Sequence, residues 1–344
     1  MEWGGNVVEM NTILVTGGAG FIGSHLCQAL LERGGRVVSI DNFNDFYDPG
    51  VKRANIGAVE ETARRLTGNG CSFISHKADI RDAGELERLF AAVRPVAVVH
   101  LAACAGVRPS IANPAQYYEV NVNGTGNLLE CMKRHDVKRL VFASSSSVYG
   151  NNSKVPFSED DPVDRPISPY AATKKAGELL CHVYHQLYGM SIACLRFFTV
   201  YGPRQRPDLA IRTFTYMIDA GMEIPFYGDG STERDYTYID DIISGVMGAL
   251  DWTEADEARY DIFNLGEART ISLSELVCTL EETLGKRAIR SHLPNQPGDV
   301  RRTNADISKA RARLGYCPQI GFEEGVARFV AWYQAQGQAG GDET

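Results

Sequence analysis

A tyrosine and a lysine four residues apart form the pair in this chain that best fits proton transfer. The segment 170–174 reads YAATK, and on a helix residues i and i+4 lie on one face. A free tyrosine has a pKa of about 10, and a neighbouring cation favours the phenolate. Tyr170 is therefore a candidate general base, and Lys174 is the cation beside it.

A run of four serines, 144–147, precedes this pair in the sequence. The run directly follows the apolar segment 139–143, which has the composition of a buried strand. We expect Ser145 to orient or relay the substrate proton together with Tyr170. The alternative is that the serines form an ordinary polar strand end.

Three glycines near the N-terminus have the spacing of a dinucleotide-binding turn. The segment 16–23 reads TGGAGFIG, follows an apolar run and opens a helical pattern. Gly17 permits a tight turn, Gly20 lets a pyrophosphate approach the backbone, and Gly23 lets helix and strand pack closely. The alternative is a glycine-rich turn without a ligand.

Two acidic positions extend this pattern. Asp41 lies eighteen residues after Gly23, at the end of the second apolar run. A carboxylate there accepts both ribose hydroxyls of an adenosine and repels a 2′-phosphate, so the pattern favours NAD over NADP. Asp79 and Ile80 follow the third apolar run, where we expect them to meet the adenine amine. Alternatively, Asp79 caps the next turn.

The elements that position these residues alternate along the first two thirds of the chain. Strands are expected at 13–15, 37–40, 71–77, 96–101, 139–143 and 191–198, and helices at 23–32, 85–93, 116–134 and 170–188. This alternation predicts an α/β fold, a Rossmann-type doubly wound parallel sheet covered on both faces. Beyond residue 200, prolines and glycines interrupt the pattern, with helices expected near 208–220, 239–250, 272–284 and 323–334.

Two domains are expected. Residues 10–198, joined by about 234–262, should form the dinucleotide-binding domain. Residues of about 199–233 and 263–335 should form a smaller mixed α/β substrate domain, and 336–344 a frayed tail. The first nine residues have the composition of a loose extension, and translation could begin at Met10 instead of Met1.

Composition narrows the function class. The 344 residues are 44% hydrophobic and 23% charged, which is typical of a globular protein, and a net charge of −8 disfavours nucleic acid as a partner. No apolar run reaches the roughly 18 residues of a membrane span, and residues 1–11 lack the pattern of a secretory signal.

The eight cysteines argue against a metal or disulfide framework. The closest two lie thirteen residues apart, and no C-x-x-C motif occurs. We therefore expect buried thiols, no metal and a cytoplasmic location.

Together these features resemble the extended short-chain dehydrogenase/reductase family, in its NAD-dependent epimerase/dehydratase branch, over residues 12–333. Within that branch the chain most resembles the nucleotide-sugar 4-epimerases that act on UDP-glucuronate. The resemblance rests on TGGAGFIGSHL (16–26), DNFNDFYDP (41–49), HLAACAGVRPSI (100–111), SSSSVYG (144–150), YAATKK (170–175), LRFFTVYGP (195–203), RPDLA (206–210), RDYTYIDD (234–241) and GDVRRTNADISKA (298–310).

The resemblance implies a bound NAD and assigns residues to it. Tyr170 becomes the base, Lys174 the anchor of the cofactor ribose and Ser145 the proton relay. Residues implied to bind NAD are Gly17, Gly20, Phe21, Ile22, Gly23, Asp41, Asn42, Asp79, Ile80, Leu101, Ala102, Ala103, Asn121, Ser144, Tyr170 and Lys174.

The resemblance also assigns a UDP-sugar site. Tyr227 is implied to stack on uracil and Arg234 to grip the pyrophosphate, with Asp299 and Arg301 near the far phosphate or ribose. For Tyr227 the alternative is core packing, and for Arg234 an ion pair with Asp240 or Asp241. The candidate holders of the sugar carboxylate are Arg108, Ser145, Ser146, Ser147, Thr199 and Arg206, and a salt bridge with Asp208 is the alternative for Arg206.

The implied reaction interconverts UDP-glucuronate and UDP-galacturonate through a transient 4-keto sugar. Related dehydratases and decarboxylating synthases carry an acidic residue before Val-Tyr-Gly, where this chain has Ser146 and Ser147, so elimination is not expected. The alternatives are a UDP-glucose/UDP-galactose 4-epimerase and a non-catalytic NAD-binding sensor.

The resemblance also implies a homodimer that forms through a four-helix bundle of helices 116–134 and 170–188. These helices carry apolar positions beyond those that one sheet face needs, and the alternative is that they belong to the ordinary core. The positions are Leu128, Leu129, Met132, Leu179, Leu180, Val183 and Leu187.

Overall fold

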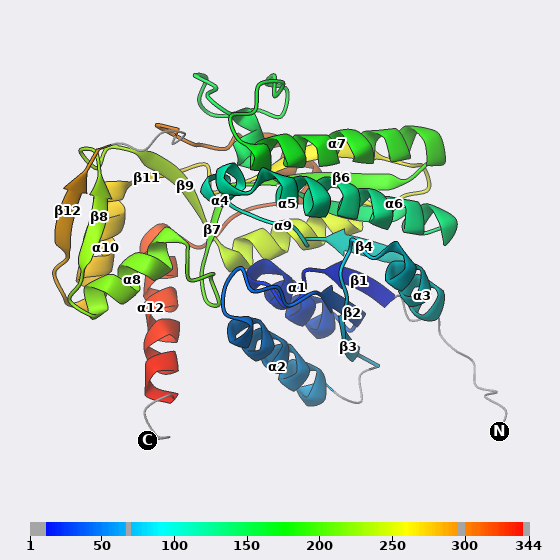
Figure 1. Cartoon of the computed structure of the whole chain (residues 1–344), viewed down its shortest axis with the longest axis horizontal. Helices are drawn as coiled ribbons and strands as arrows, with labels where there is room; N and C mark the ends of the chain where they lie inside the picture. The colour runs from blue at the N-terminus through cyan, green and yellow to red at the C-terminus, as the bar shows by residue number, and fades with distance from the viewer. Residues whose placement is uncertain (1–11, 67–69, 295–299, 340–344) are drawn as a thin grey trace.

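Seven parallel strands form the central sheet, in the order β10-β6-β5-β4-β1-β2-β3 (Figure 1). The computed structural model describes residues 12–66, 70–294 and 300–339. The strands of this sheet are β1 (Thr12–Thr16), β2 (Arg36–Asp41), β3 (Ser72–Lys77), β4 (Ala97–His100), β5 (Arg139–Ser145), β6 (Ser191–Phe197) and β10 (Tyr260–Leu265). The predicted fold class is confirmed, and β10 adds a seventh strand to the six expected.

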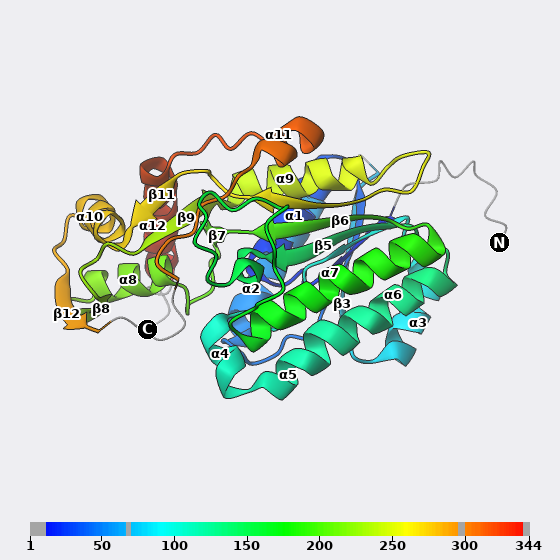
Figure 2. The ribbon, with the colours of Figure 1, turned by 90° about the horizontal axis from the view of Figure 1, so that it is seen from above.

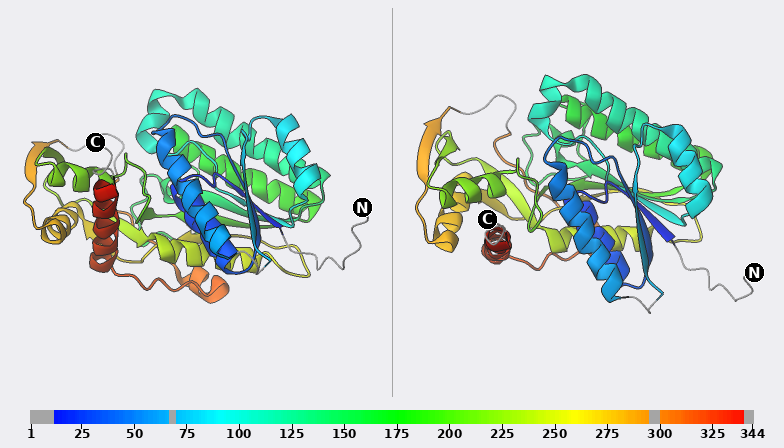
Figure 3. Two further views of the ribbon diagram at one scale, coloured as in Figure 1. Left: turned by 90° about the horizontal axis from the view of Figure 1, so that it is seen from below. Right: turned by 60° about the horizontal axis from the view of Figure 1, so that its bottom comes forward.

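Helices cover both faces of the sheet, as Figure 2 shows from above. One face carries α1 (Phe21–Glu32), α2 (Pro49–Arg65) and α9 (Ile239–Trp252), and α1 and α2 lie side by side (Figure 3). The other face carries α3 (Ala83–Val93), α6 (Thr125–Arg134) and α7 (Pro169–Tyr188).

Side chains alternate between these two faces along each strand. Ile13 and Val15 of β1 join the core under α1 and α9, whereas Leu14 joins the core under α3, α6 and α7. In β5, Val141 faces the first core and Leu140 the second. This period of two explains why the strands are continuously apolar in sequence, since both faces are buried.

A smaller part follows β6 and lies beyond the carboxyl ends of the large sheet (Figure 1). Its strands pair in two small sheets, β11-β9-β7 and β12-β8. Its elements are β7 (Thr199–Tyr201), α8 (Ala210–Asp219), β8 (Glu223–Tyr227), β9 (Glu233–Tyr238), β11 (Thr270–Ser272), α10 (Leu273–Leu284), β12 (Ile289–Leu293) and α12 (Phe322–Ala339). Helix α11 (Ser308–Leu314) returns to the large sheet, where it packs against α9 and β10 (Figure 2). The predicted domain boundaries stay a prediction.

Three helical expectations need correction. Helix α2 was not expected, because its sequence is polar, and burial of Ile56 and Val59 holds it in place. The expected helix 116–134 is α5 (Pro114–Tyr118), a π-helical turn (Glu119–Gly124) and α6. Helix α12 continues to Ala339, so the tail expected from residue 336 begins as helix. Residues 1–11 and 340–344 lie outside the described part.

The strand order reverses between the neighbouring strands β1 and β4. From β1 the chain adds β2 and β3 toward one edge of the sheet, and from β4 it adds β5 and β6 toward the other edge. In open α/β sheets ligands bind at the carboxyl ends of strands at such a point. After β4 the chain forms α4 (Val107–Ala112), and after β5 a 3-10 turn (Ser146–Tyr149). Among the described helices, none combines the length and apolar character that crossing a bilayer takes.

Candidate functional site

A cavity of about 620 Å³ lies at the carboxyl ends of the strands. Most of the predicted site residues line it, although they come from segments far apart in the sequence. The predicted residues in its wall are Gly17, Gly20, Phe21, Ile22, Gly23, Asp41, Asn42, Asp79, Ile80, Leu101, Ala102, Ala103, Ser144, Ser145, Ser146, Ser147, Tyr170, Lys174, Thr199 and Arg206.

The glycine turn between β1 and α1 can hold only small residues. Gly17 has a φ of +72°, and a Cβ there would lie 2.8 Å from the backbone nitrogen of Ala102. A Cβ on Gly23 would lie 2.2 Å from the carbonyl oxygen of Gly17. The glycines therefore let the turn pack against β4 and against α1, whose N-terminus opens on the cavity. Free backbone N–H groups and the helix dipole at such a terminus suit a diphosphate.

Asp41 ends β2 in a buried ion pair that the sequence did not reveal. Its carboxylate accepts a hydrogen bond from the backbone N–H of Phe43 at 2.8 Å. Lys52 Nζ lies 3.5 Å from the same oxygen and donates to Asn44 Oδ1 at 2.9 Å. Lys52 sits eleven residues after Asp41 on α2, so it was missed together with that helix. The pair places a carboxylate beside an ammonium in the cavity wall.

Asp79, which follows β3, both lines the cavity and closes a turn. Arg81 donates to both carboxylate oxygens through its side chain, at 3.0 and 2.8 Å, and through its backbone N–H at 2.9 Å. Asn42 adds a bond at 3.0 Å. The bond from Arg81 holds the pKa of Asp79 well below its usual range, against the opposing effect of burial. Asp79 therefore caps the turn, as the alternative expected, and also lines the cavity.

Tyr170 lies at the start of α7 and lines the same cavity as the serine run. Burial raises the pKa of its phenol, whereas a hydrogen bond with Ser145 and the charge of Arg206 oppose that rise. Ser145 Oγ also donates to Ser147 Oγ at 3.1 Å and accepts from the Ser147 backbone N–H at 3.2 Å. The predicted base and the predicted relay therefore lie in one cavity.

Lys174 lies one helical turn after Tyr170 and is buried. Its ammonium donates to the carbonyl oxygen of Ala143 at 2.7 Å and lies 5.9 Å from the centre of the Tyr170 ring. Burial lowers the pKa of Lys174 to about 8. The hydrogen bond to Ala143 therefore anchors the ammonium near the end of β5, close to the Tyr170 ring.

Asn121 does not line the cavity, but it holds a loop that does. Its side chain accepts from the Cys104 backbone N–H at 2.8 Å and donates to the Cys104 carbonyl at 2.9 Å. It also donates to Thr173 on α7 at 3.0 Å. Cys104 lines the cavity, so Asn121 contributes by positioning the backbone that follows β4.

A buried histidine supports the same loop. His100 Nδ1 lies 2.6 Å from Thr16 Oγ1, and Nε2 lies 3.0 Å from Thr125 Oγ1. Thr125 donates its own proton to the Asn121 carbonyl, and Thr16 accepts from the Ala102 backbone N–H. Because Thr125 has donated its proton to Asn121, it can only accept from His100, so the ring proton is on Nε2. Nδ1 then accepts a hydrogen bond from the Thr16 hydroxyl. Burial lowers the pKa of His100 to about 3, so it is neutral.

Arg206 lies in the cavity wall and makes the salt bridge that was the alternative to a ligand contact. Its Nε and Nη2 donate to the two oxygens of Asp208 at 2.9 and 2.7 Å. The guanidinium also lies 5.3 Å from the ring centre of Phe46, and the side chain is 17% exposed. Arg206 and Tyr170 line the same cavity, and the charge of Arg206 opposes the rise that burial causes in the pKa of Tyr170.

Four predicted substrate residues that the structure describes, namely Arg108, Tyr227, Arg234 and Arg301, do not line the cavity. Arg108 stacks over the Tyr227 ring at 5.6 Å from its centre, and Tyr227 is half-buried instead of part of the core. Arg234 donates to the Glu233 carbonyl at 2.9 Å, and the Glu233 backbone N–H bonds to the carbonyl of the exposed Arg301.

The ion-pair alternative for Arg234 is not what the structure shows. Asp240 lies 3.4 Å from Arg328, and Asp241 accepts the backbone N–H groups of residues 319 and 320. Asp299 lies outside the described residues.

The acidic groups of the cavity gather on one side. Of the described residues that line it, the acidic ones are Asp41, which ends β2, Asp45, which follows β2, and Asp79, which follows β3. The opposite wall carries the hydroxyls of residues 144–147, Tyr170 and Thr199. That wall can move a proton between hydroxyl groups, and it has no carboxylic acid of the kind that expels water from a sugar.

Comparison with known proteins agrees with this geometry. The family model described as GDP-mannose 4,6 dehydratase matches residues 14–329. The chain belongs to the GDP-mannose 4,6-dehydratase family. This membership confirms the resemblance to the NAD-dependent epimerase/dehydratase branch of the short-chain dehydrogenases/reductases.

Two curated relatives within the family are similar over most of the chain. The UDP-glucuronate 4-epimerase 5 of Arabidopsis thaliana is 45% identical over 94% of this chain and 75% of its own length. The UDP-glucuronate 4-epimerase of Thermodesulfobacterium geofontis is 44% identical over 94% of this chain and 96% of its own length.

A solved structure is similar as well. The UDP-glucuronic acid 4-epimerase of Bacillus cereus, in complex with UDP-glucuronic acid and NAD, is 38% identical with a TM-score of 0.84. The match covers 94% of this chain and 99% of that chain. The likeness therefore includes both the large sheet and the smaller part.

Proposed function

We propose that this protein is an isomerase that interconverts UDP-glucuronate and UDP-galacturonate with bound NAD. Relatives named UDP-glucuronate 4-epimerase at 44–45% identity support the proposal. The observation that carries it is the place of Arg206, whose guanidinium lies in the wall of the same cavity as Tyr170. A sugar whose C4 hydroxyl meets Tyr170 carries its C6 substituent nearby, and a carboxylate there gains from that cation.

The residues of the cavity fit the cofactor. The narrow turn around Gly17 and Gly23 and the N-terminus of α1 suit the diphosphate, and the carboxylate of Asp41 suits an unphosphorylated ribose. When bound, NAD accepts the C4 hydride of the sugar and later returns it, so net redox is zero. We expect it to stay bound between turnovers.

In this proposal Tyr170 removes the proton from the sugar C4 hydroxyl, and Ser145 orients that hydroxyl. The buried ammonium of Lys174 stabilises the phenolate through its charge and is placed to hold a ribose hydroxyl. The 4-keto sugar then turns about its bond to the β-phosphate, and reduction occurs on its opposite face. Tyr170 returns the proton to the new C4 hydroxyl.

A 4-keto glucuronate is a β-keto acid, which loses carbon dioxide when the carboxylate bond aligns with the carbonyl π system. The enzyme must therefore hold the carboxylate near the ring plane. Arg206, Thr199 and residues 145–147 line the cavity where such a grip is needed. Nη1 of Arg206 makes no hydrogen bond within the described part of the chain, so Nη1 can bind a ligand while Asp208 holds Nε and Nη2.

The nucleotide is expected to lie between the large sheet and the smaller part. Tyr227, with Arg108 over its ring, offers a face for uracil, and Arg234 offers its guanidinium to the pyrophosphate. Arg301 follows on the neighbouring segment. The assignment of Asp299 to this site stays a prediction.

Incubation of the purified protein with UDP-glucuronate tests the function directly. We expect UDP-galacturonate to form without added NAD, as measured by proton NMR, and the Tyr170→Phe variant to serve as the inactive control. Parallel incubation with UDP-glucose distinguishes the second candidate, a UDP-glucose 4-epimerase. Turnover of UDP-glucose at a rate equal to or above that of UDP-glucuronate would contradict the proposed substrate.

We also propose a homodimer in which α7 packs on its copy. Leu179, Val183 and Leu187 are 56%, 45% and 66% exposed and lie four residues apart on α7, so they form one apolar stripe. Leu128, Leu129 and Met132, which were expected to contribute, are fully buried in the core instead.

All eight cysteines are unpaired, which supports a location in the reducing cytoplasm.

A further inference from the structure

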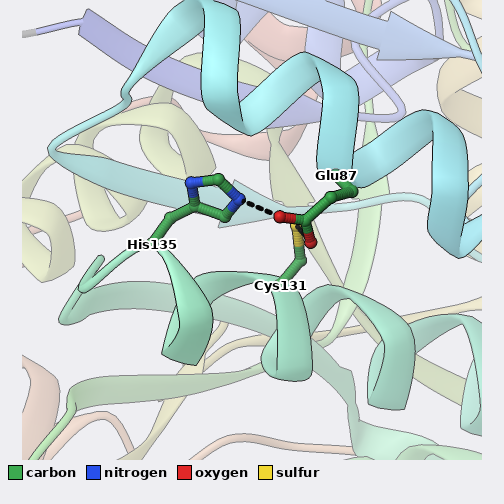
Figure 4. Close-up of side chains that lie close together, drawn as sticks. All are labelled: Glu87, Cys131 and His135. Atoms are coloured by element: carbon green, nitrogen blue, oxygen red, sulfur yellow. Dashed lines mark hydrogen bonds and ion pairs between the residues drawn. The ribbon is translucent and has the colours of Figure 1, made fainter.

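Three potential metal ligands converge between α3 and α6, away from the cavity described above (Figure 4). Glu87 lies on α3, Cys131 on α6, and His135 follows directly after α6 ends. One ligand atom from each residue lies within 4.8 Å of the other two. Cys131 and His135 are four residues apart, so the helix directs both toward α3.

The present contacts already bring the three groups together. His135 Nε2 lies 2.6 Å from Glu87 Oε1, and Cys131 Sγ lies 3.9 Å from Glu87 Oε2. Figure 4 shows the imidazole, the carboxylate and the sulfur pointing toward one another. Zinc bonds of about 2.0–2.3 Å place tetrahedral ligands roughly 3.3–3.8 Å apart. The observed separations lie on both sides of this range, so a small rotation of the half-exposed Glu87 would accommodate the ion.

The donor set selects the kind of metal. A thiolate, an imidazole nitrogen and a carboxylate oxygen match the preferences of Zn²⁺, whereas Mg²⁺ and Ca²⁺ require oxygen ligands. Three protein ligands leave the fourth tetrahedral position to water. The sequence reasoning looked for paired cysteines and therefore passed over the C-x-x-x-H spacing of residues 131–135.

Two features of the site set the conditions for binding. The Cys131 thiol is buried, and burial together with the charge of Glu87 raises its pKa to about 11, so an incoming metal must displace the thiol proton. Arg134 Nε lies 3.2 Å from Glu87 Oε2, which holds the carboxylate beside the other ligands. His135 and Glu87 are 20% and 43% exposed, which gives an ion a route from solvent.

We propose that Glu87, Cys131 and His135 bind one Zn²⁺, which joins α3 to the C-terminal end of α6. The site does not depend on the epimerase activity, because none of its residues lines the catalytic cavity. The ion would cross-link two helices that cover the same face of the sheet and contact each other.

Titration of the chelator-treated full-length protein with Co²⁺ tests the site, since a cobalt–thiolate bond gives a charge-transfer band in the near ultraviolet. We expect the band to saturate at one equivalent and to disappear when Zn²⁺ is added. Cys131→Ser should abolish it. Cys278→Ser is the matched control, because Cys278 is an exposed free thiol on α10, and this variant should keep the band.

A second variant keeps the test decisive if Cys131→Ser does not fold. Glu87→Gln removes a ligand from a half-exposed position, retains the thiolate band and should weaken Zn²⁺ binding at least about 10-fold, as loss of a ligand or of its support does. Absence of the band in the folded wild-type protein would overturn the proposal. A band that survives in Cys131→Ser, or a Zn²⁺ affinity that is unchanged in Glu87→Gln, would also overturn the proposal. The contact between His135 and Glu87 would then be only a hydrogen bond.

Discussion

The carboxylate of Glu178 accepts two hydrogen bonds from the guanidinium of Arg196, at 2.8 and 2.9 Å, and both side chains are 1% exposed. Glu178 lies on α7 four residues after Lys174, and it also accepts a bond from Ser144 at 2.7 Å. Burial disfavours its charge, yet the bonds from Arg196 keep the pKa of Glu178 below its ordinary value. The pair ties the helix that carries Tyr170 to the ends of β5 and β6.

Glu178→Gln leaves the buried Arg196 without a counter-charge. Breaking a buried ion pair in this way costs about 3–5 kcal/mol. We expect a clearly lower midpoint of thermal unfolding, measured by calorimetry. The control is Glu324→Gln, whose pair with Arg328 is exposed on both sides and is worth less than about 1 kcal/mol. Equal unfolding midpoints for the two variants would show that the buried pair is not a tie.

Tyr170→Phe keeps the aromatic ring and removes the phenol oxygen. If Tyr170 is the base, turnover should fall at least about 100-fold, the low end for general base catalysis. NAD should remain bound, because the glycine turn and Asp41 are unchanged. Turnover is measured by NMR and NAD content by release on denaturation. A variant with near-normal turnover would remove Tyr170 from its assigned role.

Arg206→Ala should separate the two candidate substrates. A hydrogen bond to a charged group is worth about 1.5–3 kcal/mol, so turnover of UDP-glucuronate should fall roughly 10–150-fold more than turnover of UDP-glucose. Loss of the grip also lets the carboxylate reach the aligned geometry, and we expect a pentose product from decarboxylation. Both are measured by NMR of the product mixture.

Asp208→Ala is the matched control for that experiment. It removes the salt bridge but leaves the Arg206 guanidinium in the cavity wall. We expect it to retain most of the preference for UDP-glucuronate. If both variants lose activity equally on both sugars, Arg206 serves the loop and not the substrate.

His100 should make the stability of the protein depend on pH. In the unfolded chain it binds a proton near pH 6.5, whereas in the folded protein burial keeps it neutral down to about pH 3. Between these values the unfolded state holds the extra proton. The free energy of unfolding therefore falls as pH falls, by at most about 1.4 kcal/mol per pH unit for this residue, and its contribution is fully present above about 6.5.

His100→Gln should reduce this pH dependence. We expect the difference in the free energy of unfolding between about pH 7 and about pH 5, measured by urea denaturation, to be smaller than in the wild type. His76→Gln is the control, since His76 is exposed. A pH dependence that is identical in His100→Gln and the wild type would refute the assignment.

The apolar stripe on α7 should determine the oligomeric state. Val183→Glu combined with Leu187→Glu places two charges in the proposed interface, so we expect the mass measured by light scattering to fall from dimer to monomer. Met222→Glu is the control, because Met222 is 46% exposed on a different part of the surface. A wild-type protein that is monomeric at all concentrations would reject the dimer.

Features that depend on a short local sequence pattern could be predicted from the sequence. The apolar strands, the glycine turn and the Tyr170–Lys174 spacing each depend on neighbours within a few residues, and the structure places all of them around one cavity. Helix α2 was missed because its buried face is narrow, and Lys52 was missed with it.

Long-range pairings could not be predicted in the same way. The contact of Lys52 with Asp41 depends on how α2 packs against α1 and β3, and the bond between Arg196 and Glu178 depends on the rotation of α7 over β6. Neither distance is encoded in spacing along the chain. The likeness to a family supplied the expected substrate residues, but Asn121 acts through Cys104, which only the fold reveals.

The π-helical turn at Glu119–Gly124 sets the direction in which Asn121 faces, and thereby its contact with Cys104. Each residue of an α-helix turns the chain by about 100°, so deleting one residue here would restore a regular helix and rotate everything before it by that angle. Asn121 would then face away from Cys104, although every residue of the catalytic set would still be present. Single-residue gaps in this segment are thus expected to be far more damaging than substitutions.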